Sequence, residues 1–347
     1  MLTLRAPART VACEVPVVLA PMAGVTDVVF RRLCRRRGPG LFVCEMVHAR
    51  LFAEGDPHTA AKVAFDPDER PRSAQVYATC PEDAAAAVAR LVEAHDVDHV
   101  DLNFGCPAPK VLRRGGGAAI PADPPRFRAI VRAAVRAAAG RPVTVKMRMG
   151  LSDAVRTDRT AARIAAEEGV AAVALHARTA ADRYAPGARW NAIAALVEAV
   201  APLPVLGNGD VFSAGDALAM VARTGCAGVV VGRGCLGRPW LFAELAAAFT
   251  GRPLPPPPTL RRSLADLVEH ARAHVAAHGP GRFRSFRRHA AAYLAGYPSE
   301  ARLRPLVFAA EGPEDLARLF DRMRDDEPLV RRGPPRAAPV RTEARAW

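Results

Sequence analysis

Short apolar runs recur along the first 232 residues of the chain, and each is bounded by Gly, Pro or charged positions. Runs of this length that are rich in β-branched residues are typical of strands. We expect eight strands, at residues 17–20, 41–46, 73–77, 99–104, 143–148, 171–177, 204–209 and 228–232.

Ala-rich stretches with helical character lie between these runs, among them residues 81–95, 124–139, 158–169 and 213–225. The last begins with a capping pattern, Ser213 followed by Asp216, and ends at Gly225. Strands that alternate with helices indicate parallel βαβ units, and eight units over about 230 residues predict a (β/α)8 TIM barrel. A doubly wound sheet is the alternative. Its Gly-rich first turn is missing here, because the first turn reads APMAGVTD.

The composition changes after residue 251, where the predicted barrel domain (1–251) ends. Residues 252–258 contain five prolines and form a predicted stiff linker. Residues 259–327 carry only helical patterns, which predicts a small all-helical C-terminal domain. Residues 328–347 are rich in Arg, Pro and Ala, and we expect this tail to be disordered.

The charge balance is strongly basic, with 49 Lys+Arg against 35 Asp+Glu and a formal net charge of +14. Such a balance favours a polyanionic partner, and nucleic acid is the leading candidate. Residues 252–347 hold 18 Arg and 11 acidic residues, a net +7, so the basic density is highest in the C-terminal part. The charge alone does not establish the partner, because an Arg-rich composition also follows from genomic base content.

Cysteine usage and hydropathy indicate the cellular compartment and the absence of a metal site. The seven cysteines include no pair two to four residues apart, which argues against a zinc site, and we expect no metal. No apolar run reaches the roughly 18 residues that span a bilayer, and the N-terminus lacks the apolar core of a signal peptide. We therefore expect a cytoplasmic protein that does not bind membranes.

Polar residues collect at the predicted strand ends, where the active site of a TIM barrel forms. Two of these ends are rich in glycine: Asn208-Gly209-Asp210 after the seventh strand and Gly232-Arg233 after the eighth. Open backbone N–H groups and an arginine at this position favour a phosphate site, although tight turns would use the same glycines. Neither sequence is a dinucleotide or Walker motif, so a mononucleotide is favoured.

Lys146 is one of only three lysines in the chain, and it lies at the end of a strand. A compact ammonium at that place is suited to the N1/C2=O edge of a flavin, since reduced flavin is anionic there; a salt bridge within the barrel is the alternative. Lys110, four residues after Cys106, is a second candidate, with a surface loop charge as its alternative.

Cys106 stands between Gly105 and Pro107 at the end of the fourth strand, which exposes and orients a thiol. A lone cysteine in this context can serve as a nucleophile or as an acid. His176 ends the sixth strand, where it can bond a cofactor or substrate or remain a core residue.

Several motifs together resemble one family. LAPMAGVTD with FR (19–31), DLNFGCPAPKV (101–111), VKMRMG (145–150), HART (176–179), LGNGDV (206–211) and VGRG with LGRPWLF (231–242) are similar to motifs of the tRNA-dihydrouridine synthases, the bacterial B-type branch in particular. RRHAAAYLAG (287–296) resembles the RNA-binding helical domain of that family, with RRH in place of RKH and an alanine in place of an aromatic residue.

The resemblance implies an FMN-containing enzyme that reduces uridines of tRNA to 5,6-dihydrouridine with NADPH or NADH. We expect a monomer, although the oligomeric state does not follow from the sequence. Hydride from reduced FMN would reach C6 of uracil, and Cys106 would protonate C5 as the general acid. Residues implied to bind the cofactor are Pro21, Met22, Ala23, Gln75, Lys146, His176, Asn208, Gly209, Asp210, Gly232 and Arg233. Residues implied to contact the substrate are Asn103, Arg148 and Arg178.

Two other functions share part of this pattern. An FMN barrel acting on a free pyrimidine, such as a dihydroorotate or dihydropyrimidine dehydrogenase, would have the same phosphate site and the same lysine at the flavin. It would not need a basic helical domain. A barrel that binds RNA but has lost its cofactor would not need Cys106, Lys146 and His176 together. The tRNA uridine that is modified and the preference between NADPH and NADH do not follow from the sequence.

Overall fold

The computed structural model describes residues 1–185, 187–321, 323 and 326–330. Nine parallel strand segments form one sheet in the order β4-β3-β11-β10-β9-β8-β7-β6-β5. A further parallel bridge joins Val43 to Ser73 of β6, so β4 and β5 occupy one strand position and the sheet closes on itself. The strands are β3 (Val17–Leu19), β4 (Leu41–Phe42), β5 (Val47–His48), β6 (Ser73–Tyr77), β7 (His99–Phe104), β8 (Val143–Arg148), β9 (Ala172–His176), β10 (Val205–Asn208) and β11 (Gly228–Val231).

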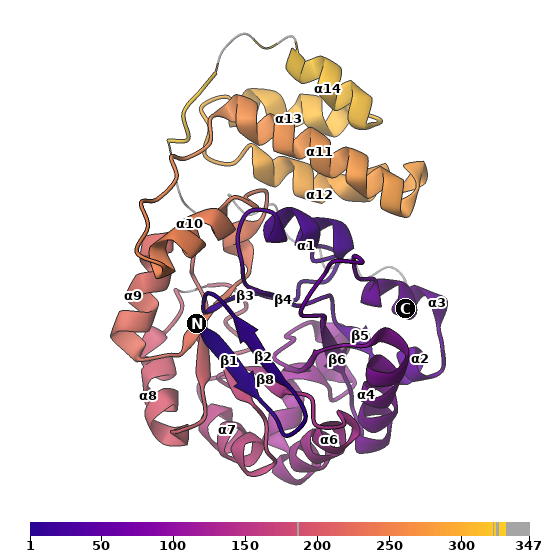
Figure 1. Ribbon diagram of the computed structural model, residues 1–347, viewed down its shortest axis with the longest axis vertical. Helices are drawn as coiled ribbons and strands as arrows, with labels where there is room; N and C mark the ends of the chain where they lie inside the picture. The colour runs from indigo at the N-terminus through magenta and orange to yellow at the C-terminus, as the bar shows by residue number, and fades with distance from the viewer. Residues whose placement is uncertain (186, 322, 324–325, 331–347) are drawn as a thin grey trace.

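The predicted TIM barrel is therefore confirmed, but the strand predicted at residues 41–46 is shorter, β4 at Leu41–Phe42, and β5 at Val47–His48 lies just beyond the predicted range. Helices surround the sheet (Figure 1). They are α1 (Val28–Arg35), α2 (Ala49–Ala53), α3 (Pro57–Ala60), α4 (Pro81–His95), α5 (Pro109–Arg113), α6 (Pro124–Ala137), α7 (Asp158–Glu167), α8 (Trp190–Val200), α9 (Ala214–Thr224) and α10 (Leu241–Phe249).

Local sequence sets the ends of these helices, as α9 illustrates. The Ser213 hydroxyl accepts a hydrogen bond from the Asp216 N–H at 3.1 Å, and the Asp216 carboxylate accepts one from the Phe212 N–H at 3.0 Å. Gly225 ends the helix with φ +68°, a left-handed conformation that costs glycine little. Both caps were predicted from the sequence, and the cap at Ser213 fixes the end of the loop that joins β10 to α9.

An N-terminal hairpin that the sequence pattern did not predict covers one end of the barrel. Its antiparallel strands β1 (Leu2–Arg5) and β2 (Thr10–Cys13) pack Leu2, Leu4, Val11 and Cys13 against apolar side chains inside the barrel. The N–H groups of its turn donate to the Gly140 carbonyl, just before β8 begins. The hairpin therefore fills the end at which the strands start (Figure 1).

The C-terminal domain holds the helices α11 (Leu260–His278), α12 (Phe283–Tyr293), α13 (Glu300–Ala309) and α14 (Pro313–Asp321). Its own core is built from residues such as Leu267, Phe286, Tyr293 and Leu316, and Trp240 reaches it from the barrel. The sequence pattern predicted three helical stretches and missed α13. The Val330 N–H donates to the Gly296 carbonyl, and residues 331–347 of the predicted disordered tail lie outside the described residues.

The helical domain packs along α1, which runs beside α11 (Figure 1). Arg37, two residues after the end of α1, is 2.6 Å from the Asp266 carboxylate of α11. A Cβ added at Gly237, which has φ +64°, would lie 2.2 Å from the backbone carbon of Ala292, so the two backbones touch there. The close approach fixes α12 against the loop that follows β11.

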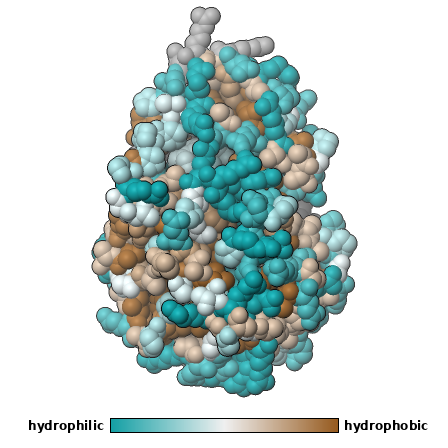
Figure 2. All heavy atoms as spheres, in the orientation of Figure 1, coloured by the Kyte–Doolittle hydropathy of each residue, from teal (hydrophilic) through white to brown (hydrophobic). Residues whose placement is uncertain are grey.

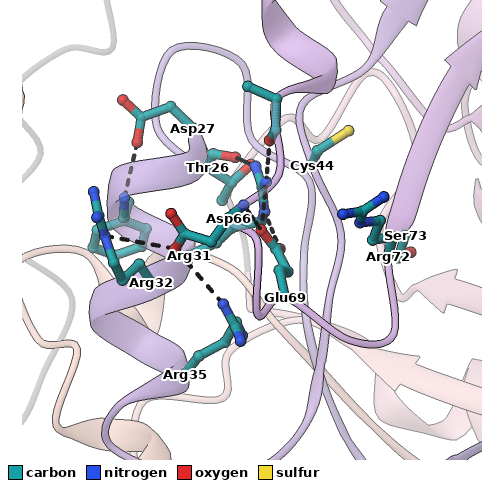
Figure 3. A network of polar contacts seen from close by, with 12 residues as sticks. Thr26, Asp27, Arg31, Arg32, Arg35, Cys44, Asp66, Glu69, Arg72 and Ser73 are labelled. Atoms are coloured by element: carbon teal, nitrogen blue, oxygen red, sulfur yellow. Dashed lines mark hydrogen bonds and ion pairs between the residues drawn. The ribbon is translucent and has the colours of Figure 1, made fainter. Parts of the chain in front are cut away.

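A buried ion pair anchors α1 to the barrel (Figure 3). The guanidinium of Arg31, fully buried, donates to both carboxylate oxygens of Glu69 at 2.7 and 3.0 Å and to the carbonyls of Thr26 and Ala64. Four donors of one side chain are thereby satisfied, as a buried charge requires. Arg31 thus holds the start of α1, and with it the loop after β3, in a fixed position.

The molecular surface is mixed in character. Figure 2 shows hydrophilic residues spreading from the helical domain down onto the barrel on the hairpin face, with smaller hydrophobic patches between them. Within the described ranges, no helix is both long and apolar enough to cross a membrane.

Candidate functional site at the barrel mouth

Strand register brings the predicted site residues into neighbouring positions. Gln75 pairs with Asp101, Asn103 pairs with Lys146, and Arg148 pairs with His176 across the parallel strands β6 to β9. His176 in turn pairs with Asn208 of β10. Because registered residues of parallel strands point to the same face, these side chains share the interior face of the barrel, at successive levels toward the carboxyl ends of the strands.

Cys106 follows β7 in a loop that Asn103 shapes. The side-chain oxygen of Asn103 accepts hydrogen bonds from the N–H groups of Gly105 at 3.1 Å and Cys106 at 3.0 Å. Burial raises the pKa of the Cys106 thiol above its ordinary value, against smaller opposing effects of the Ala108 N–H and of Arg148. The thiol therefore keeps its proton at neutral pH and can act as an acid.

A chain of buried hydrogen bonds crosses the barrel below this loop. Ser73 bonds His99 at 2.7 Å, and His99 bonds Thr144 at 2.9 Å. Thr144 then donates to the Asp101 carboxylate at 2.6 Å, and Gln75 Nε2 donates to the same carboxylate at 2.7 Å.

One end of this chain of hydrogen bonds reaches the loop that holds Cys106. Asn103 Nδ2 donates to Gln75 Oε1 at 2.9 Å, so the orientation of both amides is fixed by the Asp101 carboxylate. Gln75 is only 1% exposed. Its predicted hydrogen bond to a cofactor has to use the second N–H of its amide nitrogen or the second lone pair of its amide oxygen, because the other two are already engaged. The network links the cysteine loop to the interior of the barrel.

Lys146 lies in β8 beside Asn103. Burial, followed by the positive charge of Arg148, lowers the pKa of its ammonium to about 8. Within the described part of the chain, no hydrogen bond or ion pair joins this ammonium to another side chain. A half-buried ammonium in this state is suited to an anionic or hydrogen-bond-accepting ligand. Lys110, the other lysine singled out from the sequence, lies on α5.

His176 and Arg148 occupy neighbouring strand ends. Burial, together with the charges of Arg148, Lys146 and Arg178, lowers the pKa of His176 well below its ordinary value, so its imidazole is neutral. Arg148 is 3% exposed and donates to the carbonyls of Gly105, Thr179 and Arg183. The Arg148 guanidinium thus ties the cysteine loop to the loop after β9. Its predicted contact with the substrate stays a prediction.

Asp210 joins two arginines at the glycine-rich loops. Its carboxylate is 2.6 Å from Arg178 Nη2 and 3.1 Å from Arg233 Nη2, and it also accepts from the Ala188 N–H. The Asp210 backbone has φ +57°, which is uncommon outside glycine and is found preferentially at functional sites. Arg178 is buried by these contacts, whereas Arg233 remains partly exposed toward the mouth.

The glycine at position 209 is required by its surroundings. It has φ +126°, and a Cβ there would lie 2.7 Å from the Cβ of Ala188. Asn208 differs from its predicted role in that its amide donates to the Val230 carbonyl at 2.7 Å and so joins β10 to β11. Its remaining groups are the ones left for a cofactor.

The loop after β3 lies beside the second glycine-rich loop. A Cβ placed at Gly232 would be in ordinary contact, 3.7 Å, with the Met22 sulfur. Pro21 and Met22 are half-buried and Ala23 is exposed, which leaves apolar surface on this side of the mouth. The structure thus brings the three residues of this loop next to the predicted phosphate site.

Sequence reasoning missed Asp101, Thr144 and Tyr184. Asp101 lies two residues before Asn103 in β7, and Thr144 lies two residues before Lys146 in β8. Because side chains two apart in a strand point to the same face, the sequence could have placed Asp101 and Thr144 on the interior face as well. Tyr184 is 48% exposed in the loop after β9, and the Arg233 guanidinium lies 4.5 Å from its ring centroid. Only the folded loop reveals this contact.

At the open end of the (β/α)8 barrel, the strand ends bring together a protonated thiol, a lysine and a glycine-rich loop that carries an arginine. This arrangement defines a barrel enzyme. More narrowly, the chain belongs to the dihydrouridine synthase family, because the family model described as Dihydrouridine synthase (Dus) matches residues 18–325. The match includes both the barrel and the helical domain.

Named relatives agree with this assignment. A "Probable tRNA-dihydrouridine synthase" of Mycobacterium tuberculosis is 52% identical over 319 residues, covering 89% of this chain and 82% of that protein. The "tRNA-dihydrouridine synthase B" of Xanthomonas campestris is 38% identical over 299 residues, covering 86% of this chain and 89% of that protein. A solved structure of a FabK mutant from Thermotoga maritima overlaps 65% of this chain and 62% of that chain, with 13% identity and a TM-score of 0.40.

Proposed function

We propose that this chain reduces uridines of tRNA to 5,6-dihydrouridine, with FMN held at the barrel mouth and NADPH or NADH as the reductant. One observation carries the proposal: Asn103 holds the backbone N–H of Cys106, whose thiol has a raised pKa, and Asn103 is paired in register with Lys146 of the next strand. An acid next to a cation is what the reduction of a polarised C=C bond requires, since a hydride and a proton have to be added in turn.

The residues at the mouth fit FMN. Lys146 has an ammonium without a protein partner among the described residues, suited to the polar edge of the ring system. The loops at Gly209 and Gly232 bring open backbone to the mouth, and Arg233 can turn from Asp210 to a phosphate. Met22 and Pro21 offer apolar contact to the ring. When bound and reduced, FMN supplies the hydride that is added to C6 of uracil.

The chain's own residues supply the remaining steps. Cys106 Sγ–H donates its proton to C5, and the thiolate is then reprotonated from solvent. Neutral His176 offers one donor and one acceptor without adding charge, and the pair Asn103–Gln75 keeps the cysteine loop in register. Arg148 and Arg178 act through the loops they hold, and we keep their direct contact with RNA as a proposal.

The helical domain is proposed to bind tRNA next to the mouth. Residues 252–347 carry a net +7, of which the helical domain (259–327) accounts for +2, and Arg288 of α12 lies against Gly24 in the loop after β3. RNA bound along this domain would therefore meet the barrel at the loop that borders the FMN site. Exposed Tyr184 between arginines provides a ring on which a flipped base can stack.

The experiment uses purified full-length protein reconstituted with FMN, NADPH and unmodified tRNA transcript, with dihydrouridine measured by nucleoside mass spectrometry. Cys106→Ala is expected to lower the rate about 10²- to 10⁴-fold, the usual contribution of a general acid, while FMN binding is unchanged. A protein that forms no dihydrouridine but turns over free uracil or dihydroorotate would overturn the proposal. A protein that cannot be loaded with FMN would do the same.

A further inference from the structure

Histidines collect at the seam between the two domains, away from the barrel mouth layer. His274 and His278 lie one turn apart on α11, and both face Asp27, the residue that begins α1. The Nε2 atom of His278 is 2.7 Å from Asp27 Oδ2, and the Nδ1 atom of His274 is 3.6 Å from the same oxygen. All three atoms lie within 4.8 Å of one another.

The hydrogen bonds of Asp27 leave one oxygen for this cluster. Oδ1 accepts from the Phe30 N–H at 2.8 Å and caps α1, while Oδ2 faces the two imidazoles. Figure 3 shows Asp27 at the start of α1, apart from the Arg31–Glu69 pair farther along the helix. The cap and the buried ion pair together hold the Asp27 carboxylate in a fixed position.

The tautomer of His274 follows from its other neighbour. The Ser285 hydroxyl donates its single proton to the Arg282 carbonyl at 2.6 Å, so toward His274 Nε2, 3.3 Å away, it can only accept. Nε2 of His274 therefore carries the ring proton. Nδ1 is then the ring nitrogen that faces Asp27, it is buried without a hydrogen-bond partner, and His274 is 7% exposed.

With His274 neutral, two acceptors face each other, His274 Nδ1 and Asp27 Oδ2. The contact is then favourable only with a positive charge between them, either a proton on Nδ1 or a metal ion. The orientation of His274 by a serine at its far nitrogen is the arrangement that metal-bound histidines use. Two histidines at i and i+4 with one carboxylate form a common zinc ligand set.

We infer that Asp27, His274 and His278 form a binding site for a divalent transition-metal ion, Zn²⁺ above all, that joins the helical domain to the barrel. Ligand atoms around tetrahedral zinc are roughly 3.3 Å apart, from metal–ligand distances of about 2.0–2.1 Å. The present separations of 2.7 and 3.6 Å from Asp27 Oδ2 bracket that value, so small side-chain rotations suffice. Water would complete the coordination.

This inference departs from the expectation of no metal, which rested on cysteine spacing and so concerned thiolate sites. The site is separate from the proposed catalytic residues, because its ligands come from α1 and α11 rather than from the strand ends. Its role would be structural: the metal would fasten α11 to α1 at the end nearest the mouth, where Arg288 meets Gly24.

The test is a titration of full-length apo-protein with Co²⁺, followed by competition with Zn²⁺. We expect one saturable site with the visible absorption of four-coordinate cobalt, and a melting temperature that rises by about 3 °C when Zn²⁺ is 100-fold above its Kd. Affinity should fall as the pH is lowered through 6.5, because protons compete for the imidazoles. The two partly exposed thiols, Cys80 and Cys106, are alkylated beforehand so that they cannot bind metal.

Variants separate the site from other binding. Asp27→Asn keeps the helix cap, since asparagine also accepts from the Phe30 N–H, but it removes the charged ligand; together with His278→Ala it should weaken Co²⁺ binding at least 30-fold. His58→Ala, an exposed histidine elsewhere, is the matched control and should change nothing. Absence of a saturable site in the wild type, or its survival in the double variant, would overturn the inference and leave a proton-mediated ion pair. Dihydrouridine formation is not part of the readout, so this test is independent of the proposed function.

Discussion

The side-chain oxygen of Asn103 accepts a hydrogen bond from the backbone N–H of Cys106 at 3.0 Å. The same asparagine donates to Gln75, so one side chain both shapes the cysteine loop and fixes an amide proposed to face the cofactor. Asn103, placed among the substrate contacts by family resemblance, therefore has a positioning role that can be seen in the free protein.

We expect Asn103→Ala to lower the rate of dihydrouridine formation about 10²-fold, the order of loss that follows a displacement of about 1 Å in a catalytic group. FMN affinity should change little. The rate at which iodoacetamide modifies Cys106 reports the position of the loop directly and should change as well. An unchanged alkylation rate with a raised KM for tRNA would instead indicate direct substrate contact.

Asp101 predicts a pH dependence of stability. Burial raises the pKa of its carboxyl from 3.8 to about 6, although bonds from Thr144 and Gln75 oppose the shift. Because the folded state holds this proton more tightly than the unfolded state, the contribution is full at low pH and is lost as the pH rises from about 4 to about 6. The wild type should lose about 2–3 kcal/mol of unfolding free energy from this group across that window.

Urea unfolding of Asp101→Asn and wild type at several pH values measures the effect. The variant lacks the titrating group, so the difference in unfolding free energy should move in its favour between pH 4 and 6.5. Parallel curves for the two proteins would show that the carboxyl does not change protonation on unfolding in this range.

The pair Arg31–Glu69 predicts a large loss of stability on removal of one partner. Arg31→Met leaves the buried carboxylate of Glu69 without its counter-charge, and we expect a loss of about 3–5 kcal/mol in unfolding free energy. Adding Glu69→Gln should restore part of it. The control is Arg128→Met, whose ion pairs with Glu167 and Glu168 lie at the surface and should contribute no more than about 1 kcal/mol. Equal losses for Arg31→Met and the control would contradict the prediction.

The close backbone contact at Gly237 predicts a substitution that separates the two domains. Gly237→Ala places a methyl 2.2 Å from the Ala292 backbone, so α12 has to move away from the barrel. We expect FMN binding to persist while dihydrouridine formation falls at least tenfold, and calorimetry to show two transitions. Gly251→Ala is the matched control, because its φ of +68° imposes a similar strain but nothing lies within 4 Å of the added Cβ. One unchanged transition in Gly237→Ala would refute the close approach.

The strand ends of the barrel could be predicted from the sequence because a parallel barrel brings all of them to one side, whatever the details of its loops. Cys106, Lys146 and His176 were found in this way. The partners of Arg148 and Asn208 could not be predicted, since their donors meet carbonyls of loops and strands far away in the sequence.

Two elements escaped the pattern for local reasons. The hairpin strands are four residues each, and their apolar positions alternate with charged or small ones, so neither forms an apolar run. Helix α13 contains Pro305, a residue that normally ends a helix, and its apolar residues do not fall on one clear face. Contacts within the helical domain stabilise α13 as a helix, although its local sequence does not predict one.

The N-terminal hairpin has a consequence for the order of events in catalysis. Leu2, Leu4, Val11 and Cys13 pack against apolar side chains inside the barrel at its far end, so the mouth is the side at which molecules would bind. If the chain uses a nicotinamide nucleotide and tRNA as proposed, both have to reach the same mouth, and we expect each to leave before the other enters. Steady-state kinetics should then give parallel double-reciprocal lines, and excess of either partner should inhibit by blocking the entrance of the other.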